Sequence, residues 1–188
     1  MAASARREEL VDRALELFYR HGFHATGIDR ILAESGVAKM TLYKHFKSKD
    51  ELILAALRRR DEKFRSWFMR EIERRGRTPR ERLLVVFDIL AVWFASRDFR
   101  GCMFVNAAAE FHDPGDPVHE AAAEHKRLVR EFLFKLASEA GARDPAALAG
   151  SLNLLLEGAI AVAHVAGDAA AARDARAAAA TLVDRALD

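Results

Sequence analysis

The 188-residue chain contains one cysteine, Cys102, and only four prolines and ten glycines. A single cysteine excludes an internal disulfide framework and suits a reducing compartment. Few helix-breaking residues, no runs of β-branched residues and abundant alanine predict an all-α fold. No apolar run approaches the roughly 18 residues that a membrane span needs, and the N-terminus lacks the apolar core of a secretory signal. We therefore expect a cytoplasmic protein with no membrane segment.

The net charge of +2 conceals a strong asymmetry along the chain. Residues 1–82 carry 20 Lys and Arg against 13 Asp and Glu, whereas residues 83–188 carry 10 against 15. A basic first part joined to an acidic second part suits a protein that offers one end to a polyanion. Arg58, Arg59, Arg60, Arg74 and Arg75 also suit a simpler role as the solvated face of one long helix.

Hydrophobic periodicity and the positions of Gly and Pro predict nine helices. Pro79 and Pro145 suit first helical turns, where a missing N–H does no harm. The final helix is rich in alanine and alternatively reads as a low-complexity tail, but Leu182 and Val183 continue an apolar face and favour a helix. The expected ranges are about 4–21, 28–35, 39–46, 49–75, 79–96, 102–111, 118–140, 145–166 and 169–187.

Residues 26–46 predict two short amphipathic helices joined by a tight turn. Ile28, Ile31 and Leu32 share one face of the first helix, and Thr26 with Asp29 forms a variant of the capping box. Gly36 stands where a left-handed residue ends a helix. This is the pattern of a helix-turn-helix, whose second helix enters the major groove of DNA. An ordinary solvated surface helix is the alternative on composition alone.

The exposed face of the second helix carries residue types that suit DNA. Lysines neutralise phosphates, hydroxyl and imidazole groups donate hydrogen bonds, and methyl groups meet those of thymine. Ala38, at the start of this helix, cannot cap it through its side chain. The predicted DNA-binding residues are Thr26, Lys39, Met40, Thr41, Tyr43, Lys44, His45 and Lys49.

The segment GVAKMTLYKHFKSKDEL, residues 36–52, resembles the signature of tetracycline-repressor-type (TetR family) regulators. That signature has the core G-V-[SA]-x-x-[TS]-[LIF]-Y-x-[HY]-F, and the resemblance covers about residues 8–55. Ala38 stands where the family often has Ser. The resemblance implies a DNA-binding domain over 1–48, an effector-binding and dimerisation domain over 49–188, and a repressor released from its operator by a small molecule.

The segment FRGCMFVNAAAEF, residues 99–111, resembles one found in a branch of the same family. Asn106 and Glu110 lie four residues apart on one helical face, so they either line a cavity or satisfy their own hydrogen bonds in the core. Aromatic walls suit a partly apolar effector, as the resemblance implies. The predicted effector pocket consists of Phe64, Phe68, Phe87, Trp93, Met103, Asn106, Glu110, Phe111, Phe132 and His164.

Other chemistry receives less support from the sequence. Asn106, Glu110, His125 and His164 would bind a metal only if their helices converged, and no close pair of histidines supports this. Cys102 is either a sensor of redox state or a small buried hydrophobe. A small helical enzyme is a third alternative, but the chain has no glycine-rich phosphate loop, zinc-spaced cysteines or nucleophile elbow. We expect no metal, no cofactor and no catalytic residue.

The last two predicted helices are expected to form a homodimer. Ala159, Ala163 and Ala166 allow close approach of helices, and Leu152 with Leu156 adds apolar area. A two-fold dimer places two recognition helices on the order of 34 Å apart, which predicts a near-palindromic operator in double-stranded DNA. A dimeric DNA-binding protein without any effector is the main alternative.

Overall fold

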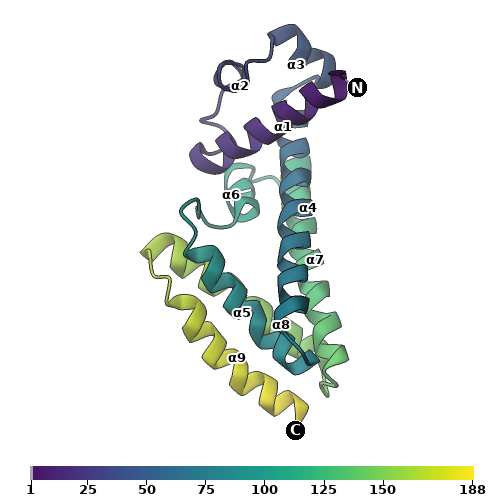
Figure 1. Cartoon of the computed structure of the whole chain (residues 1–188), viewed down its shortest axis with the longest axis vertical. Coiled ribbons are helices and arrows are strands. Elements are labelled where there is room, and N and C mark those ends of the chain that lie inside the picture. The colour runs from purple at the N-terminus through teal and green to yellow at the C-terminus, as the bar shows by residue number, and fades with distance from the viewer. Residues whose placement is uncertain (1) are drawn as a thin grey trace. The chain divides into compact units, whose positions relative to one another are not determined.

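The computed structural model describes residues 2–188, with side chains from residue 5 onward. Over this range the chain is all-α, which confirms the predicted fold class (Figure 1). Most predicted helix ends lie within two residues of the observed ones. The helices are α1 (Ala2–His21), α2 (Ile28–Ser35), α3 (Lys39–His45), α4 (Lys49–Arg75), α5 (Pro79–Phe94), α6 (Met103–Glu110), α7 (Pro117–Glu139), α8 (Pro145–Ala166) and α9 (Ala171–Leu187).

The helices group into two compact units. The first unit joins the chain up to Lys63 with Met103–His125, and the second joins Phe64–Cys102 with Lys126–Asp188. The first unit thus holds α1–α3, the first half of α4, α6 and the start of α7. The expected domain boundary between residues 48 and 49 remains a prediction, since this grouping follows contacts rather than chain order.

The core of the first unit forms where α2 and α3 pack against α1. Phe18 of α1, Ile31 of α2 and Leu42 of α3 are all buried. Gly36 ends α2 in the left-handed conformation, with φ of 66°, and its N–H donates to the carbonyl of Leu32. This is the turn that the sequence predicts, and it orients α3 relative to α2. Ala38 precedes α3 without a side-chain cap, also as predicted.

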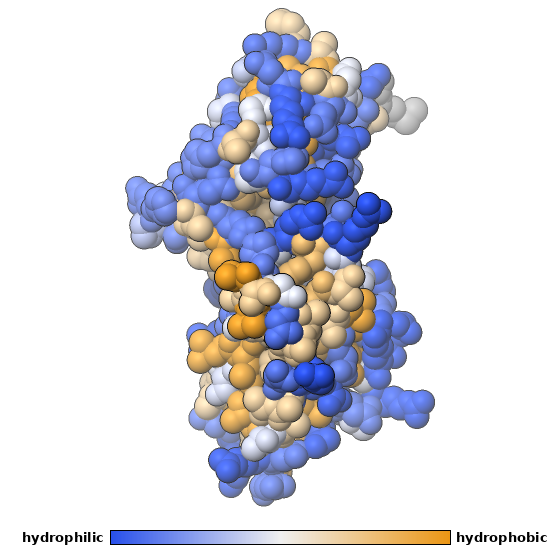
Figure 2. Space-filling view, turned by 90° about the vertical axis from the view of Figure 1, so that its left-hand side faces the viewer, coloured by the Kyte–Doolittle hydropathy of each residue, from blue (hydrophilic) through white to orange (hydrophobic). Residues whose placement is uncertain are grey.

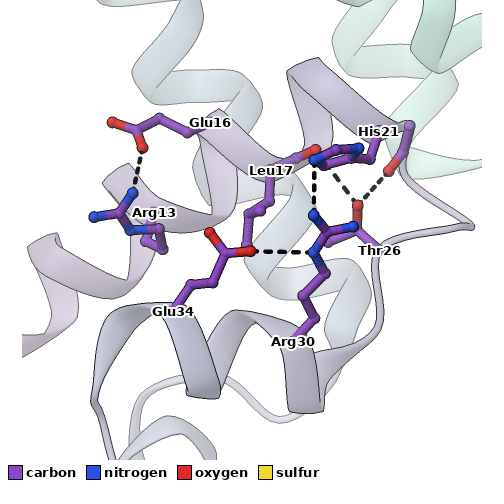
Figure 3. A network of polar contacts seen from close by, with 8 residues as sticks. Arg13, Glu16, Leu17, His21, Thr26, Arg30 and Glu34 are labelled. Atoms are coloured by element: carbon purple, nitrogen blue, oxygen red, sulfur yellow. Dashed lines mark hydrogen bonds and ion pairs between the residues drawn. The ribbon is translucent and has the colours of Figure 1, made fainter.

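The predicted capping role of Thr26 is wrong. Gly27 is the N-cap of α2 and makes no side-chain hydrogen bond there. The Thr26 hydroxyl instead donates to the carbonyl of Gly22 at 2.7 Å and more weakly to that of Leu17 at 3.4 Å (Figure 3). Leu17 lies near the end of α1 and Gly22 directly follows the helix, so one hydroxyl joins these two carbonyls. Thr26 therefore fastens the α1–α2 connection to the end of α1.

The second unit is built around α5, α8 and α9, which pack on one another. α5 begins with a capping box, in which the Thr78 hydroxyl accepts from the N–H of Glu81 and the Glu81 carboxylate accepts from that of Thr78. Arg176 of α9 pairs with Asp88 of α5 at 2.8 Å. The alanine-rich C-terminal segment is thus a packed helix, and its interpretation as a low-complexity tail is wrong.

The expectation about apolar runs needs correction at α8. This helix of 22 residues, Pro145–Ala166, is long and apolar enough to cross a membrane by length and composition. Leu152 and Leu156 are nevertheless buried inside the second unit, so packing against protein accounts for that face. Only 39% of its most apolar 18-residue window is buried within the chain, so much of the remaining apolar surface faces outward.

Candidate nucleic-acid interface

The second helix of the helix-turn-helix, α3, has one buried and one exposed face. Leu42 is completely buried against the core of the first unit, and this contact fixes the rotation of the helix. Met40 and Tyr43 are 84% and 48% exposed, although both side chains are largely apolar. Together with Thr41 and Lys44 they line one shallow surface hollow. The structure therefore brings four of the predicted DNA-binding residues together on one accessible patch.

Lys39 and His45 are the first and last residues of α3. The Lys39 ammonium is 3.8 Å from a carboxylate oxygen of Asp29, and both side chains are well exposed. Such an exposed pair contributes little to stability, so Lys39 exchanges Asp29 for another anion at small cost. His45 is half-buried, with its ring against that of Phe46.

Two other predicted contacts lie elsewhere in the first unit. Thr26 has no exposed surface, so its side chain cannot reach DNA in this conformation, and that prediction is wrong. The Lys49 ammonium donates to the carbonyl of His24 at 3.4 Å. Burial lowers the pKa of Lys49, while the carboxylates of Asp50 and Glu110 act in the opposite direction. A phosphate contact by Lys49 stays a prediction.

A groove in the first unit is lined by α4, α6 and the start of α7. Its volume is about 370 Å³. At its wall the ring of His125 stacks on that of Phe104, with centroids 3.7 Å apart, and His125 Nδ1 lies 2.7 Å from a carboxylate oxygen of Asp61. None of the residues predicted for the effector pocket lines it. The lining residues are Leu54, Leu57, Arg58, Asp61, Phe104, Pro117, Glu120, Ala121, Glu124 and His125.

Part of the predicted effector pocket gathers in the second unit. Phe64 stacks on Phe68 with centroids 5.5 Å apart and meets Trp93 at 4.8 Å, and Phe132 lies 6.5 Å from Phe68. Phe68 is only 2% exposed. The rings of these four residues pack against one another in an aromatic cluster.

The remaining residues of the predicted pocket belong to both units. Phe87 and Met103 are each 1% exposed and belong to the cores of different units. Asn106 is half-buried, and His164 is exposed beside Phe99, with ring centroids 6.1 Å apart. The predicted set thus divides between the two units, and a single pocket formed from it stays a prediction.

Glu110 and Phe111 contact the connection between α1 and α2 instead. The Glu110 carboxylate accepts hydrogen bonds from the backbone N–H groups of Phe23 at 2.8 Å and His24 at 2.6 Å. Burial alone would raise the pKa of Glu110, but these bonds and the neighbouring His24 ring outweigh it, so the pKa lies below its usual value. The i, i+4 relation to Asn106 gave no hint of this contact, because the partners lie 86 and 87 residues away in the chain.

The alternative chemical sites are also placed by the structure. No group of three His, Cys, Asp or Glu side chains suited to a metal occurs among the described residues. Cys102 is buried, and its sulfur accepts from the ammonium of Lys126 at 3.3 Å. That ammonium also bonds to Glu157 at 2.6 Å. Burial would lower the pKa of Lys126, but Cys102 and Glu157 together raise it.

Residues 10–56 match the family model described as "Bacterial regulatory proteins, tetR family". Residues 79–179, more than half of the chain, match the model "Tetracyclin repressor-like, C-terminal domain". The chain belongs to the TetR family. The chain is similar to the crystal structure of a TetR-family transcriptional regulator from Streptomyces coelicolor, with 31% sequence identity and a TM-score of 0.91. The comparison covers 98% of this chain and 97% of that one.

Two relatives with curated descriptions are informative about the DNA-binding part. The transcriptional repressor ComR of Escherichia coli is 27% identical over 132 residues, which cover 68% of this chain and 63% of ComR. The transcriptional activator FasR of Mycolicibacterium smegmatis is 50% identical over 54 residues, which cover 29% of this chain and 25% of FasR. As a member of the TetR family the protein is a helix-turn-helix DNA-binding transcriptional regulator and not an enzyme. The helix-turn-helix reading of residues 26–46 is thereby confirmed.

Proposed function

We propose that the protein is a dimeric cytoplasmic repressor that binds a near-palindromic operator and leaves it when a small-molecule effector binds. The observation that carries the proposal is the exposed patch on α3, in which Met40 and Tyr43 face solvent beside Lys39 and Lys44. Apolar, hydroxyl and cationic groups at one short helix suit methyl groups, base edges and phosphates respectively.

Dimerisation is supported by the outward face of α8. Leu154 is 74% exposed, Val165 is 86% exposed and Val162 is 46% exposed. Figure 2 shows a broad apolar area on the face of the second unit that carries α8 and α9. A contiguous apolar patch of this kind marks an interaction site in a soluble protein. A second copy related by a two-fold axis would cover the patch with the same patch of its own.

The direction of regulation rests on the extent of the two similarities. The likeness to the repressor ComR extends over 132 residues, whereas that to the activator FasR is confined to 54. A match limited to about a quarter of FasR concerns DNA recognition more than the response that follows it. We therefore favour repression.

For the effector we favour the groove of the first unit over the predicted aromatic pocket. The groove is open, with an apolar wall at Leu54, Leu57 and Phe104, so it suits a partly apolar molecule. Phe104 belongs to α6, the helix whose last residue, Glu110, contacts the α1–α2 connection. Release requires that the effector bind the DNA-incompetent conformation more tightly than the competent one.

A dimeric DNA-binding protein without an effector is the second candidate. The observation in its favour is the close packing of Phe64, Phe68 and Trp93, where a pocket was expected. Ala121→Trp, which places a large ring in the groove, discriminates between the two. Compounds that raise the melting temperature of the wild type should no longer do so in the variant, while both proteins retain operator binding. A compound library that yields no stabilising ligand for the wild type would favour the second candidate.

The experiment that tests the DNA-binding part of the proposal is selection of genomic fragments by the pure protein. Bound fragments should share a near-palindrome with half-sites centred about one helical turn apart, and footprinting should show two protected half-sites. Sedimentation should give a protein dimer on each site. Fragments without a common motif, or protection of a single half-site by a monomer, would refute it.

A further inference from the structure

The α1–α2 connection is held by a single carboxylate that comes from α6. Glu110 Oε1 accepts from the N–H of Phe23, and Oε2 accepts from the N–H of the next residue, His24. His24 Nδ1 lies 2.9 Å from the same Oε2, so its proton points at the carboxylate. Three donors from two consecutive residues thus converge on one anion.

The backbone of the connection is shaped for this anion. Gly22 adopts the left-handed conformation, with φ of +85°, directly after α1. Successive N–H groups beside a left-handed residue form a concave anion-binding site. A Cβ at Gly22 would lie 2.9 Å from Glu110 Oε1, so a side chain there would collide with the carboxylate. Glycine therefore serves both the turn and the close approach of Glu110.

Packing around the carboxylate extends the contact to neighbouring helices. Phe111 stacks on His24, with centroids 4.8 Å apart, and meets the edge of Phe23 at 6.1 Å. Phe23 is 1% exposed and stacks on Phe18 of α1 at 5.3 Å. Lys49, the first residue of α4, donates to the carbonyl of His24. The connection is therefore tied to α1, α4 and α6, and it leads directly into α2.

We propose that Glu110 is a positioning residue through which α6 sets the orientation of the helix-turn-helix, so that operator affinity depends on this carboxylate although it does not touch DNA. The inference rests on the proposed operator binding. Without the carboxylate the α1–α2 connection is less ordered. The entropy lost when the connection is ordered again on DNA opposes operator binding. Since α6 also contributes Phe104 to the groove, the same contact is the route by which a bound effector alters α2 and α3.

The test compares operator binding and amide hydrogen exchange in the wild type, Glu110→Gln and Glu62→Gln. The control removes the same charge from an exposed residue of the same unit. We expect Glu110→Gln to weaken operator binding about tenfold, in the range of measured couplings between sites. The backbone N–H of His24 should exchange faster. In the wild type it donates to Oε2 of Glu110, whereas the glutamine side chain places an NH₂ group, itself a donor, at that position. Glu62→Gln should match the wild type in both measurements.

Chemical rescue separates positioning from a general loss of structure. In Glu110→Ala the backbone site is empty, so added acetate should recover part of the operator affinity, while chloride at equal ionic strength should not. Wild-type affinity in Glu110→Gln, tighter binding, or recovery with chloride equal to that with acetate would overturn the proposal. If the wild type binds no DNA, the proposed function is refuted as well. If the wild type and Glu110→Gln bind DNA equally, only the proposed role of Glu110 is refuted.

Discussion

The carboxylate of Glu110, at the end of α6, accepts a hydrogen bond of 2.6 Å from the backbone N–H of His24, between α1 and α2. These two residues lie 86 positions apart in the chain. Their contact brings the α1–α2 connection, which leads into the helix-turn-helix, to the helix that also contributes Phe104 to the groove. The first unit therefore contains the DNA-reading helices together with a candidate means of controlling them.

The lowered pKa of Glu110 predicts a specific dependence of stability on pH. A carboxyl group with a lowered folded-state pKa stabilises the fold above its ordinary pKa of about 4.3, and this contribution disappears as the pH falls through the folded value. The free energy of unfolding of the wild type should exceed that of Glu110→Gln at pH 7. The difference should vanish at acidic pH. Denaturant unfolding of both proteins between pH 3 and pH 7 measures it, and a difference that persists unchanged at the acid end would contradict the assignment.

The pair of Asp61 and His125 is expected to stabilise the first unit. His125 is 4% exposed, and Asp61 holds its ring against Phe104. Asp61→Asn weakens the hydrogen bond to the buried imidazole of His125 and should lower the free energy of unfolding by roughly 1–3 kcal/mol. Glu62→Gln, on the exposed side of the same helix, is the matched control and should have little effect. Equal unfolding curves for the two variants would show that the buried pair is energetically neutral.

Ala38→Ser should stabilise the helix-turn-helix. Ala38 occupies the N-cap of α3 in an extended conformation, with φ of −65° and ψ of 145°, and offers no side-chain acceptor. A serine hydroxyl there would accept from an N–H of the first turn and raise the free energy of unfolding by about 1 kcal/mol. Ala33→Ser, an exposed position within α2, is the control and should be slightly destabilising. Stabilisation by both changes, or by neither, would argue against the capping explanation.

The apolar face of α8 should control the oligomeric state. Leu154→Glu and Val165→Glu place carboxylates on the most exposed large apolar side chains of that helix. Each should raise the dimer dissociation constant by at least about tenfold, because dimerisation would bury the new carboxylate away from water with no partner for its charge. Val105→Glu alters a half-exposed valine of α6 and serves as the control. Analytical ultracentrifugation measures the change, and unaltered dimers in both α8 variants would place the interface elsewhere.

Local features of the fold follow from the sequence because their causes are local. Gly36 in the left-handed conformation and Pro79 in the first turn of α5 depend on neighbouring residues, and the apolar spacing within its own helix marks Leu42 as a buried position. Thr26 shows the limit of this reasoning, because its hydroxyl had two possible sets of backbone partners. In the folded protein it bonds to carbonyls near and just after the end of α1.

The parts of the site that bring distant residues together could not be predicted. Glu110 shares a helical face with Asn106, and this pattern is equally compatible with a pocket or with a core contact. The contact of Glu110 with Phe23 and His24 forms only when α6 reaches the end of α1. His125 likewise appeared as one of several histidines, since Asp61 lies 64 residues earlier. Similarly, helical periodicity identified the aromatic residues of the second unit but not whether they enclose space.

The most direct test of the central claim is titration of a selected operator fragment with Lys39→Ala and Tyr43→Ala. Lys135→Ala, which removes an exposed lysine from the second unit, is the control. Each α3 variant should bind about tenfold more weakly, because loss of a good contact to a base edge costs roughly 1–3 kcal/mol and loss of a phosphate contact weakens binding to all sequences. Lys39→Ala should also reduce the dependence of log affinity on log salt by about one. If both α3 variants bind the operator as tightly as the wild type and Lys135→Ala, then α3 is not the recognition helix.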